Sequence, residues 1–258
     1  MRRVVTFILL TWPIWSHSQD RYPIDWEAVG EEALIHFTAL LRTDTTNPPG
    51  NETAVATYLR DALAGDGIEG RLYALEPGRD NLVARVRGNG SKAPILVMGH
   101  TDVVGVQREN WSVEPFDAVQ RDGYIYGRGT LDDKDSVTAG LMLLLMLERE
   151  NIELDRDVIF LAEAGEEGTP EVGVDFMVNE HWDEIAAEYC LAEGGGAVAS
   201  EGTVRYVSIA TTEKFPMRVR LLAGRYGRSR VGASSRQRHI GAGAGGFETI
   251  GLAASHAP

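Results

Sequence analysis

Residues 94–102 read PILVMGHTD, and this stretch decides the fold. Pro94–Met98 is apolar almost throughout, as expected of a strand that is covered on both faces of a sheet. In such sheets, sites gather beyond the carboxyl ends of the strands. His100 and Asp102 are two residues apart, so in extended backbone their side chains point the same way. Asp102 can then accept a hydrogen bond from one imidazole nitrogen while the other faces a metal, although the triplet alone fits a surface turn equally well.

The flanking sequence predicts alternating helices and strands. Helices are predicted at 25–42, 51–63, 136–149 and 172–179. Extended, strand-like runs occupy 71–75, 81–87, 157–162, 188–192, 203–211 and 215–222. This alternation indicates an α/β domain with a largely parallel or mixed sheet.

Three aspartates stand just before the predicted helix at 136–149. Residues 126–135 read YGRGTLDDKD. Acids at the start of a helix can cap it and interact favourably with its dipole. We assign Asp133 and Asp135 to that role, or to a supporting role behind a metal ligand. Asp132, the first of the group, is the one that we place on a metal.

Two further carboxylate segments follow predicted strands. Residues 161–168 read LAEAGEEG, and adjacent side chains in extended backbone diverge, so Glu166 and Glu167 can serve different partners. One can bind a metal while the other takes a proton from metal-bound water. A solvated acidic loop is the alternative, which the bracketing glycines after a buried strand make less favourable. Residues 191–196, LAEGGG, deliver Glu193 into a glycine turn in the same way.

The combined donor set favours a hydrolytic zinc site. Catalytic zinc accepts imidazole and carboxylate ligands, whereas structural zinc is mostly held by Cys and His, and Cys190 is the one cysteine of the sequence. Carboxylates alone would suggest magnesium or manganese; His100 shifts the choice to zinc, with cobalt or manganese as substitutes. Calcium is a weaker alternative, because it takes about six to eight oxygen ligands and avoids imidazole.

Composition narrows the class of protein. Of the 258 residues, 43% are hydrophobic and 24% charged, which excludes a disordered, collagenous or polytopic membrane chain. The net charge of −13 argues against a nucleic-acid partner, because phosphate binding needs a basic face.

The two ends of the chain differ from the rest. Residues 1–18 combine two arginines, an apolar run at 4–15 and small residues at 16 and 18, which predicts a signal peptide and an exported, periplasmic or extracellular protein. A buried first strand or helix is the alternative. The run is shorter than the roughly 20 residues that span a bilayer, so we expect no membrane association after signal removal. Residues 223–258 are rich in Gly, Ala, Ser and Arg without apolar periodicity, as in a flexible basic tail or a slipped reading frame.

Four motifs together resemble one enzyme family. GHTDVV, WSVEPFDAVQRDGYIYGRGTLDDKD, AEAGEEG and LAEGGG, in this order and spacing, are similar to the dinuclear zinc metallopeptidases. That family includes aminoacylase, glutamate carboxypeptidase, carboxypeptidase S and succinyl-diaminopimelate desuccinylase, with the carboxypeptidase S-like branch nearest. The resemblance covers roughly residues 24–222. It implies the N-terminal part of a three-layer catalytic domain over residues 19–212, with a mixed, mostly parallel sheet that is incomplete here. Only the start of an α+β lid domain follows, at 213–222.

The resemblance also implies roles for single residues. His100 and Glu193 would hold one zinc ion, and Glu167 would hold the second. Asp132 would bridge the two ions, with a cis peptide bond to Asp133 as a family feature.

The reaction implied is hydrolysis of an amide bond in a peptide or an N-acyl amino acid. Glu166 would be the general base that deprotonates the bridging water, which attacks a carbonyl polarised by zinc, and Asp102 would orient His100. Glu166 would then deliver the proton to the leaving nitrogen.

The sequence departs from the family beyond Leu222. Family members are longer, and they add a lid that dimerises in many of them and a returning segment with the last zinc-binding histidine. The six histidines here offer no replacement: His17, His36, His100, His181, His239 and His256. We therefore expect a truncated or frame-shifted member without a homodimer, with a weakened second zinc site and weak or no activity. The alternative is a non-catalytic metal-binding or interaction protein.

Overall fold

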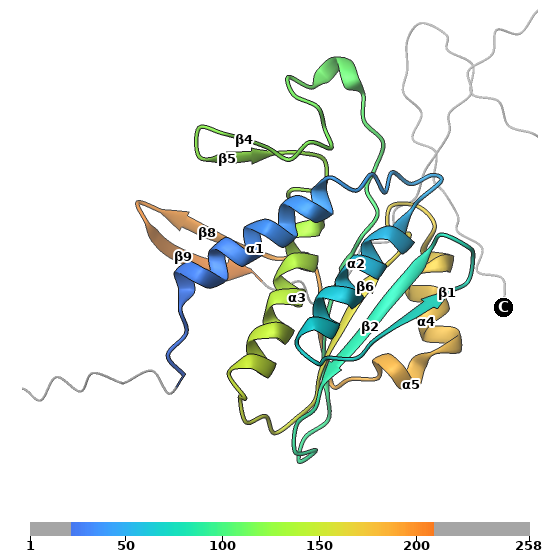
Figure 1. Ribbon diagram of the computed structural model, residues 1–258, viewed down its shortest axis with the longest axis vertical. Helices are drawn as coiled ribbons and strands as arrows, with labels where there is room; N and C mark the ends of the chain where they lie inside the picture. Colours follow the sequence, from blue (N-terminus) through green and yellow to red (C-terminus); the bar gives the residue numbers. More distant parts are fainter. Residues whose placement is uncertain (1–21, 209–258) are drawn as a thin grey trace, which may run out of the picture. The chain divides into compact units, whose positions relative to one another are not determined.

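The computed structural model describes residues 22–208 (Figure 1). The chain divides into two units after Val207, and the described residues other than Ser208 belong to the first. Within the described residues, no helix is both long and apolar enough to cross a membrane. The predicted signal peptide (1–18), lid start (213–222) and tail (223–258) lie outside this part of the chain, so export and the truncation stay predictions.

A five-stranded sheet with the order β1-β2-β6-β3-β7 forms the centre of the fold. Its strands are β1 (Gly70–Ala74), β2 (Asp80–Val86), β3 (Ile95–His100), β6 (Val158–Glu163) and β7 (Tyr189–Leu191). β2 pairs antiparallel with both neighbours, whereas β6–β3 and β3–β7 pair in parallel. Four of these strands therefore run in one direction and β2 runs against them, which confirms the mixed, mostly parallel sheet.

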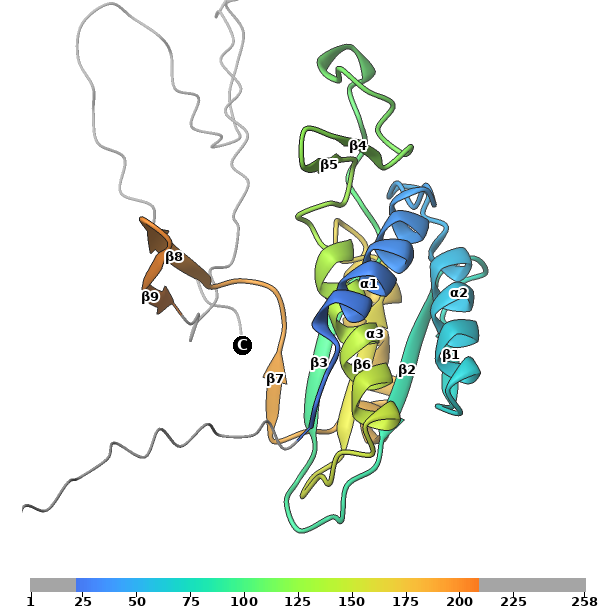
Figure 2. The same cartoon turned by 60° about the vertical axis from the view of Figure 1, so that its left-hand side comes forward.

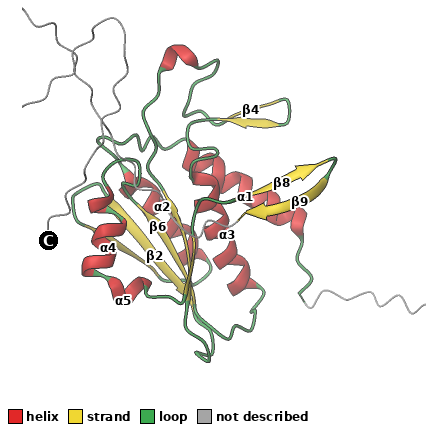
Figure 3. Cartoon of the chain, turned by 180° about the vertical axis from the view of Figure 1, so that it is seen from behind, coloured by secondary structure: helices red, strands yellow, loops and turns green. Residues whose placement is uncertain are grey.

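Helices cover both faces of the sheet. α1 (Trp26–Leu41), α2 (Glu52–Gly65) and α3 (Lys134–Arg149) lie on one side (Figure 1). α4 (Val174–Glu180) and α5 (Trp182–Ile185) lie on the other side, seen from behind in Figure 3. The predicted three-layer α/β fold is confirmed, and the bounds of the long helices agree with the sequence prediction to within about two residues.

β6 lies at the centre of the core, and all six of its residues are buried. Because side chains alternate along a strand, Phe160 and Ala162 contact the cluster beneath α2 and α3, while Ile159 and Leu161 pack with α4 and α5. α3 approaches closely enough that a Cβ on Gly140 would lie 2.3 Å from the Phe160 ring. This two-sided burial explains why a nearly continuous apolar run, rather than an alternating one, marks the strand.

Two hairpins and two short 3₁₀ helices complete the described residues. β4 (Val119–Arg121) pairs with β5 (Tyr124–Tyr126), and β8 (Gly196–Ser200) pairs with β9 (Thr203–Ser208) (Figure 2). The 3₁₀ helices are η1 (Arg108–Asn110) and η2 (Pro170–Val172). The sequence predicted only the strand at 203–211 among these elements, because short exposed strands carry no long apolar pattern.

Lys134 joins α3 to the end of α1. Its side chain is completely buried, and Nζ donates to the carbonyl oxygens of Leu40 at 2.9 Å and Thr43 at 2.7 Å. These carbonyls lie at and just after the C-terminus of α1, where the regular helical hydrogen bonds end, and the Leu40 carbonyl also accepts from the backbone N–H of Thr43 at 3.1 Å. Burial lowers the pKa of Lys134 to about 8.

We predict that Lys134→Met destabilises the protein, because methionine fills the space but takes the Nζ donor away from the carbonyls of Leu40 and Thr43. The Leu40 carbonyl keeps the backbone N–H of Thr43 as a donor, so the loss falls mainly on the Thr43 carbonyl. An acceptor that loses its partner costs about 1–3 kcal/mol in the free energy of unfolding. Urea unfolding followed by circular dichroism measures this loss. Lys92→Met is the matched control, because Lys92 pairs with Asp155 at the surface, where substitutions change stability by about 0.5 kcal/mol or less. Equal losses for the two variants would contradict the assignment.

Candidate metal centre

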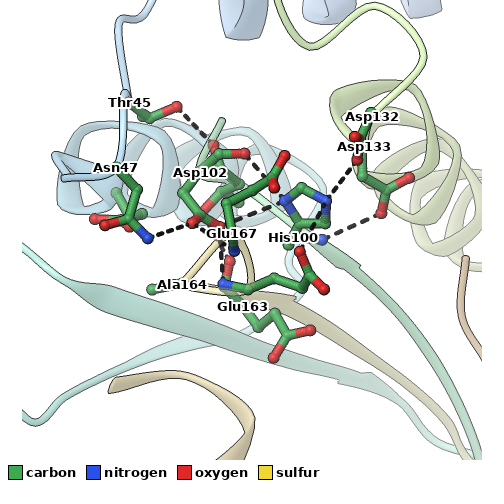
Figure 4. Close-up of polar contacts among 12 residues, drawn as sticks. Thr45, Asn47, His100, Asp102, Asp132, Asp133, Glu163, Ala164 and Glu167 are labelled. Atoms are coloured by element: carbon green, nitrogen blue, oxygen red, sulfur yellow. Dashed lines mark hydrogen bonds and ion pairs between the residues drawn. The ribbon is translucent and has the colours of Figure 1, made fainter. Parts of the chain in front are cut away.

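The predicted site residues meet where β3 and β6 end (Figure 4). His100 is the last residue of β3 and Glu163 the last of β6, and the parallel register places these two side by side. The loop after β6 carries Glu166 and Glu167 directly beyond this edge. The structure thus brings together residues from four separate segments at the carboxyl ends of neighbouring parallel strands, as the sequence predicted.

His100 lies at the centre of the cluster. Its side chain is 1% exposed, and Nε2 lies 2.9 Å from Oδ1 of Asp132. The same nitrogen lies 3.7 Å from Oε2 of Glu193 and 3.9 Å from Oε2 of Glu166. Three carboxylates from three segments therefore surround one imidazole nitrogen.

The other ring nitrogen of His100 fixes the orientation of the imidazole. Nδ1 lies 3.0 Å from the backbone carbonyl oxygen of Asp102, and 3.4 Å from Oδ1 of the Asp102 side chain. A carbonyl only accepts, so Nδ1 carries a proton. Nε2 faces the acids, where it donates to Asp132 when the imidazole is charged and offers its lone pair to a cation when the imidazole is neutral. The sequence placed the Asp102 carboxylate in this role, whereas the shorter contact comes from its main chain.

The Asp102 carboxylate also holds the acidic loop. Oδ1 accepts from the backbone N–H of Glu166 and Oδ2 from that of Glu167, each at 3.1 Å. Oδ2 also accepts from Nδ2 of Asn47 at 2.7 Å. Burial opposes ionisation of Asp102, but the hydrogen bonds from His100 and Asn47 outweigh it and hold the pKa of Asp102 below its usual range.

Asp132 and Asp133 are joined by a cis peptide bond, as the family resemblance implied. Asp133 occupies the N-cap position of α3 without making a side-chain capping bond. Its Oδ2 accepts from the backbone N–H of His100 at 3.2 Å, and a Cβ on Gly99 would lie 2.7 Å from the same oxygen. Asp133 therefore takes the supporting role behind His100, while Asp135 is exposed in the first turn of α3.

The electrostatics of the cluster fit a cation. Burial is the main cause that raises the pKa of Glu167 and of Glu193, and it raises the pKa of Glu163 to about 8. Oε2 of Glu163 is buried without a hydrogen-bond partner in the described part of the chain. Burial alone would lower the pKa of His100, but the neighbouring carboxylates of Asp102 and Asp132 raise it to about 10. The partly desolvated carboxylates of Glu167 and Glu193, together with the imidazole and the acids beside it, form a donor set that a divalent cation satisfies.

Two groups of side chains could hold a metal ion within residues 22–208. They are His100, Asp133 and Glu193, and His100, Glu166 and Glu167, with ligand atoms within 4.8 Å of one another in each group. The other histidines of this part lie elsewhere. His36 bonds the hydroxyl of Tyr58, and His181 packs against two aromatic rings.

The sequence prediction missed several residues of the site. Asn47, Arg79 and Thr169 form hydrogen bonds around Asp102 and the acidic loop, and Glu163 lies buried beneath it. Asn47 stands in an Asn-Pro-Pro-Gly stretch, which is typical of a turn, and Thr169 and Arg79 carry no local signal. Only the folded chain brings them together.

Known proteins are similar to this chain in amino-acid sequence. The family model for peptidase family M20/M25/M40 matches residues 96–229. A probable succinyl-diaminopimelate desuccinylase of Staphylococcus epidermidis is 30% identical over 189 residues, which are 72% of this chain and 45% of that protein. The corresponding protein of Staphylococcus aureus (strain Mu50) is 37% identical over 169 residues, covering 65% and 41%. The chain thus spans less than half the length of these curated relatives.

A solved structure is also similar. The M20 family metallo-carboxypeptidase Sso-CP2 of Sulfolobus solfataricus matches with a TM-score of 0.57 and 25% identity, over 64% of this chain and 38% of that one. The family match contains every predicted site residue from His100 to Glu193, and it confirms the family inferred from the sequence. The chain belongs to peptidase family M20/M25/M40.

Proposed function

We propose that the chain is a metal-dependent hydrolase that cleaves an amide bond in a peptide or an N-acyl amino acid. The observation that carries this proposal is the buried Nε2 of His100, which faces the carboxylates of Asp132, Glu193 and Glu166 at an edge of parallel strands. The names of the relatives, a metallo-carboxypeptidase and two desuccinylases, are in keeping with it.

Two cations would share the centre. We assign His100, Asp132 and Glu193 to the first and Asp132 and Glu167 to the second. The imidazole favours zinc, and cobalt or manganese are compatible with the same ligands. When bound, such ions supply Lewis acids that polarise an amide carbonyl and acidify water.

Glu166 is assigned as the general base. Its backbone N–H is fixed by Asp102, and its carboxylate lies 3.9 Å from Nε2 of His100. The carboxylate would take a proton from the attacking water and pass it to the leaving nitrogen. Glu167 is also held by Asp102, so the two neighbouring glutamates are anchored while their side chains serve different partners.

We predict that the full chain, freed of metal, binds one zinc ion tightly and a second weakly. The reason is that the described residues give the first ion an imidazole and two carboxylates, but the second only two carboxylates. Isothermal titration calorimetry with zinc measures both steps. His100→Ala should lower the affinity of the tightly bound zinc ion. We expect a loss greater than the roughly 10–100-fold seen when a residue that only hydrogen-bonds a metal ligand is removed. His36→Ala is the control; equal binding by both variants would refute the ligand set.

We predict that Glu166→Gln lowers kcat by about 10²–10⁴-fold while zinc affinity is kept, because glutamine cannot take the proton. Glu167→Gln should instead weaken the second zinc ion. Hydrolysis of dipeptides and of N-succinyl and N-acetyl amino acids, assayed with zinc, cobalt or manganese, measures the rates. Glu171→Gln, at an exposed glutamate, is the control.

Turnover by the 258-residue chain should be low, because the second ion has few ligands among the described residues. A chain that binds zinc but hydrolyses none of these substrates would favour the alternative, a non-catalytic metal-binding protein.

A further inference from the structure

We propose that a buried polar network fixes the acidic loop, residues 165–169, relative to His100. Its members outside the metal centre are Asn47, Arg79 and Thr169, and we infer that they are positioning residues for the reaction. The inference rests on the proposed function, because the loop carries the assigned base and one assigned cation ligand. The network deepens that function by naming what sets the geometry of the site.

The acidic loop is a closed turn. The backbone N–H of Thr169 donates to the carbonyl of Gly165 at 2.8 Å, and that of Gly168 donates to the carbonyl of Glu166, also at 2.8 Å. Gly165 has a φ of +77°, and a Cβ there would lie 2.5 Å from the carbonyl oxygen of Thr169. Because these two hydrogen bonds close the turn, the position of Thr169 restrains the position of Glu166.

The hydroxyl of Thr169 receives two donors from distant segments. Nδ2 of Asn47 and Nη2 of Arg79 each lie 2.9 Å from its oxygen. Asn47 is 122 residues and Arg79 is 90 residues away in the sequence. A hydroxyl oxygen has two acceptor positions, so these donors fill both and set the place of the loop's last residue.

Arg79 is itself immobilised. Nε and Nη2 donate to the two carboxylate oxygens of Glu52 at 2.6 and 2.7 Å, and both side chains are buried. This bidentate pairing fixes the guanidinium plane, and therefore the direction of the remaining Nη2 hydrogen. Gly50 allows the approach, because a Cβ there would lie 2.4 Å from Nε of Arg79. Glu52 is the first residue of α2, so the anchor is a helix.

Asn47 links the same hydroxyl to the other end of the loop. Its Nδ2 also donates to Oδ2 of Asp102 at 2.7 Å (Figure 4). Its backbone N–H donates to the carbonyl of Val103 at 2.9 Å. Asp102 in turn accepts from the N–H groups at the start of the loop. The loop is therefore held at its start by Asp102 and at its end by Thr169, with Asn47 bridging the two.

The test uses the full chain and Thr169→Val, which removes the acceptor oxygen and leaves the Arg79–Glu52 pair intact. In metal-free protein, hydrogen exchange is measured by mass spectrometry on peptides covering 164–168. It should become about 3–10-fold faster, which is the rate ratio that corresponds to the net free energy of one hydrogen bond. In a cobalt titration followed by absorbance, the weaker site should lose about 10–100-fold in affinity. Thr169→Ser restores the hydroxyl and should restore both readouts.

Thr138→Val is the matched control, because its buried hydroxyl donates to the Lys134 carbonyl within α3. It should leave loop exchange and cobalt affinity unchanged. If Thr169→Val does not fold, Asn47→Ala, which removes both side-chain donations, is measured in the same way. Wild-type exchange and cobalt affinity in the variant would overturn the inference. A wild-type chain that binds no cobalt would refute the proposed function, while the exchange comparison would still decide the inference.

Discussion

The candidate metal centre depends on the hydrogen bonds that the buried carboxylate of Asp102 accepts. It accepts hydrogen bonds from the backbone of Glu166 and Glu167 and from the side chain of Asn47, while its own main-chain carbonyl orients His100. One residue thus sets the imidazole and the acidic loop at once. A charged acceptor that makes several bonds inside a protein is stable only when all of its donors stay in place, so the loops around it are ordered together.

Much of the fold could be predicted because its signals are local. The apolar run before His100 marks a strand buried on both faces, and the helices at 26–41 and 134–149 carry long apolar stripes. The carboxyl-end rule then places His100, Glu166 and Glu193 near one another without knowledge of distances. The order of strands and helices can be predicted from the sequence, and this order identifies the edge of the sheet at which the acidic side chains lie.

The remainder depends on contacts between distant segments. Nothing near Thr169 indicates that Asn47 and Arg79 converge on its hydroxyl, and nothing near Lys134 indicates that it binds the end of α1. The spacing of the two residues and the family resemblance assign Asp102 to His100, but only the folded backbone shows that the carbonyl makes a shorter contact than the carboxylate. Polar residues in loops acquire their roles from tertiary neighbours, which a local pattern does not encode.

The pairing of β3 with β6 makes the site sensitive to amino-acid substitutions far from the acidic residues. His100 and Glu163 are aligned because Ile95 is aligned with Val158 at the other end of the same ladder. A slip of one residue anywhere along it would turn every side chain to the opposite face and carry the imidazole away from its neighbours. The register of β3 against β6 therefore sets the distance between His100 and the neighbouring acids. Core substitutions remote from any ionisable group can alter that distance by disturbing the strand alignment.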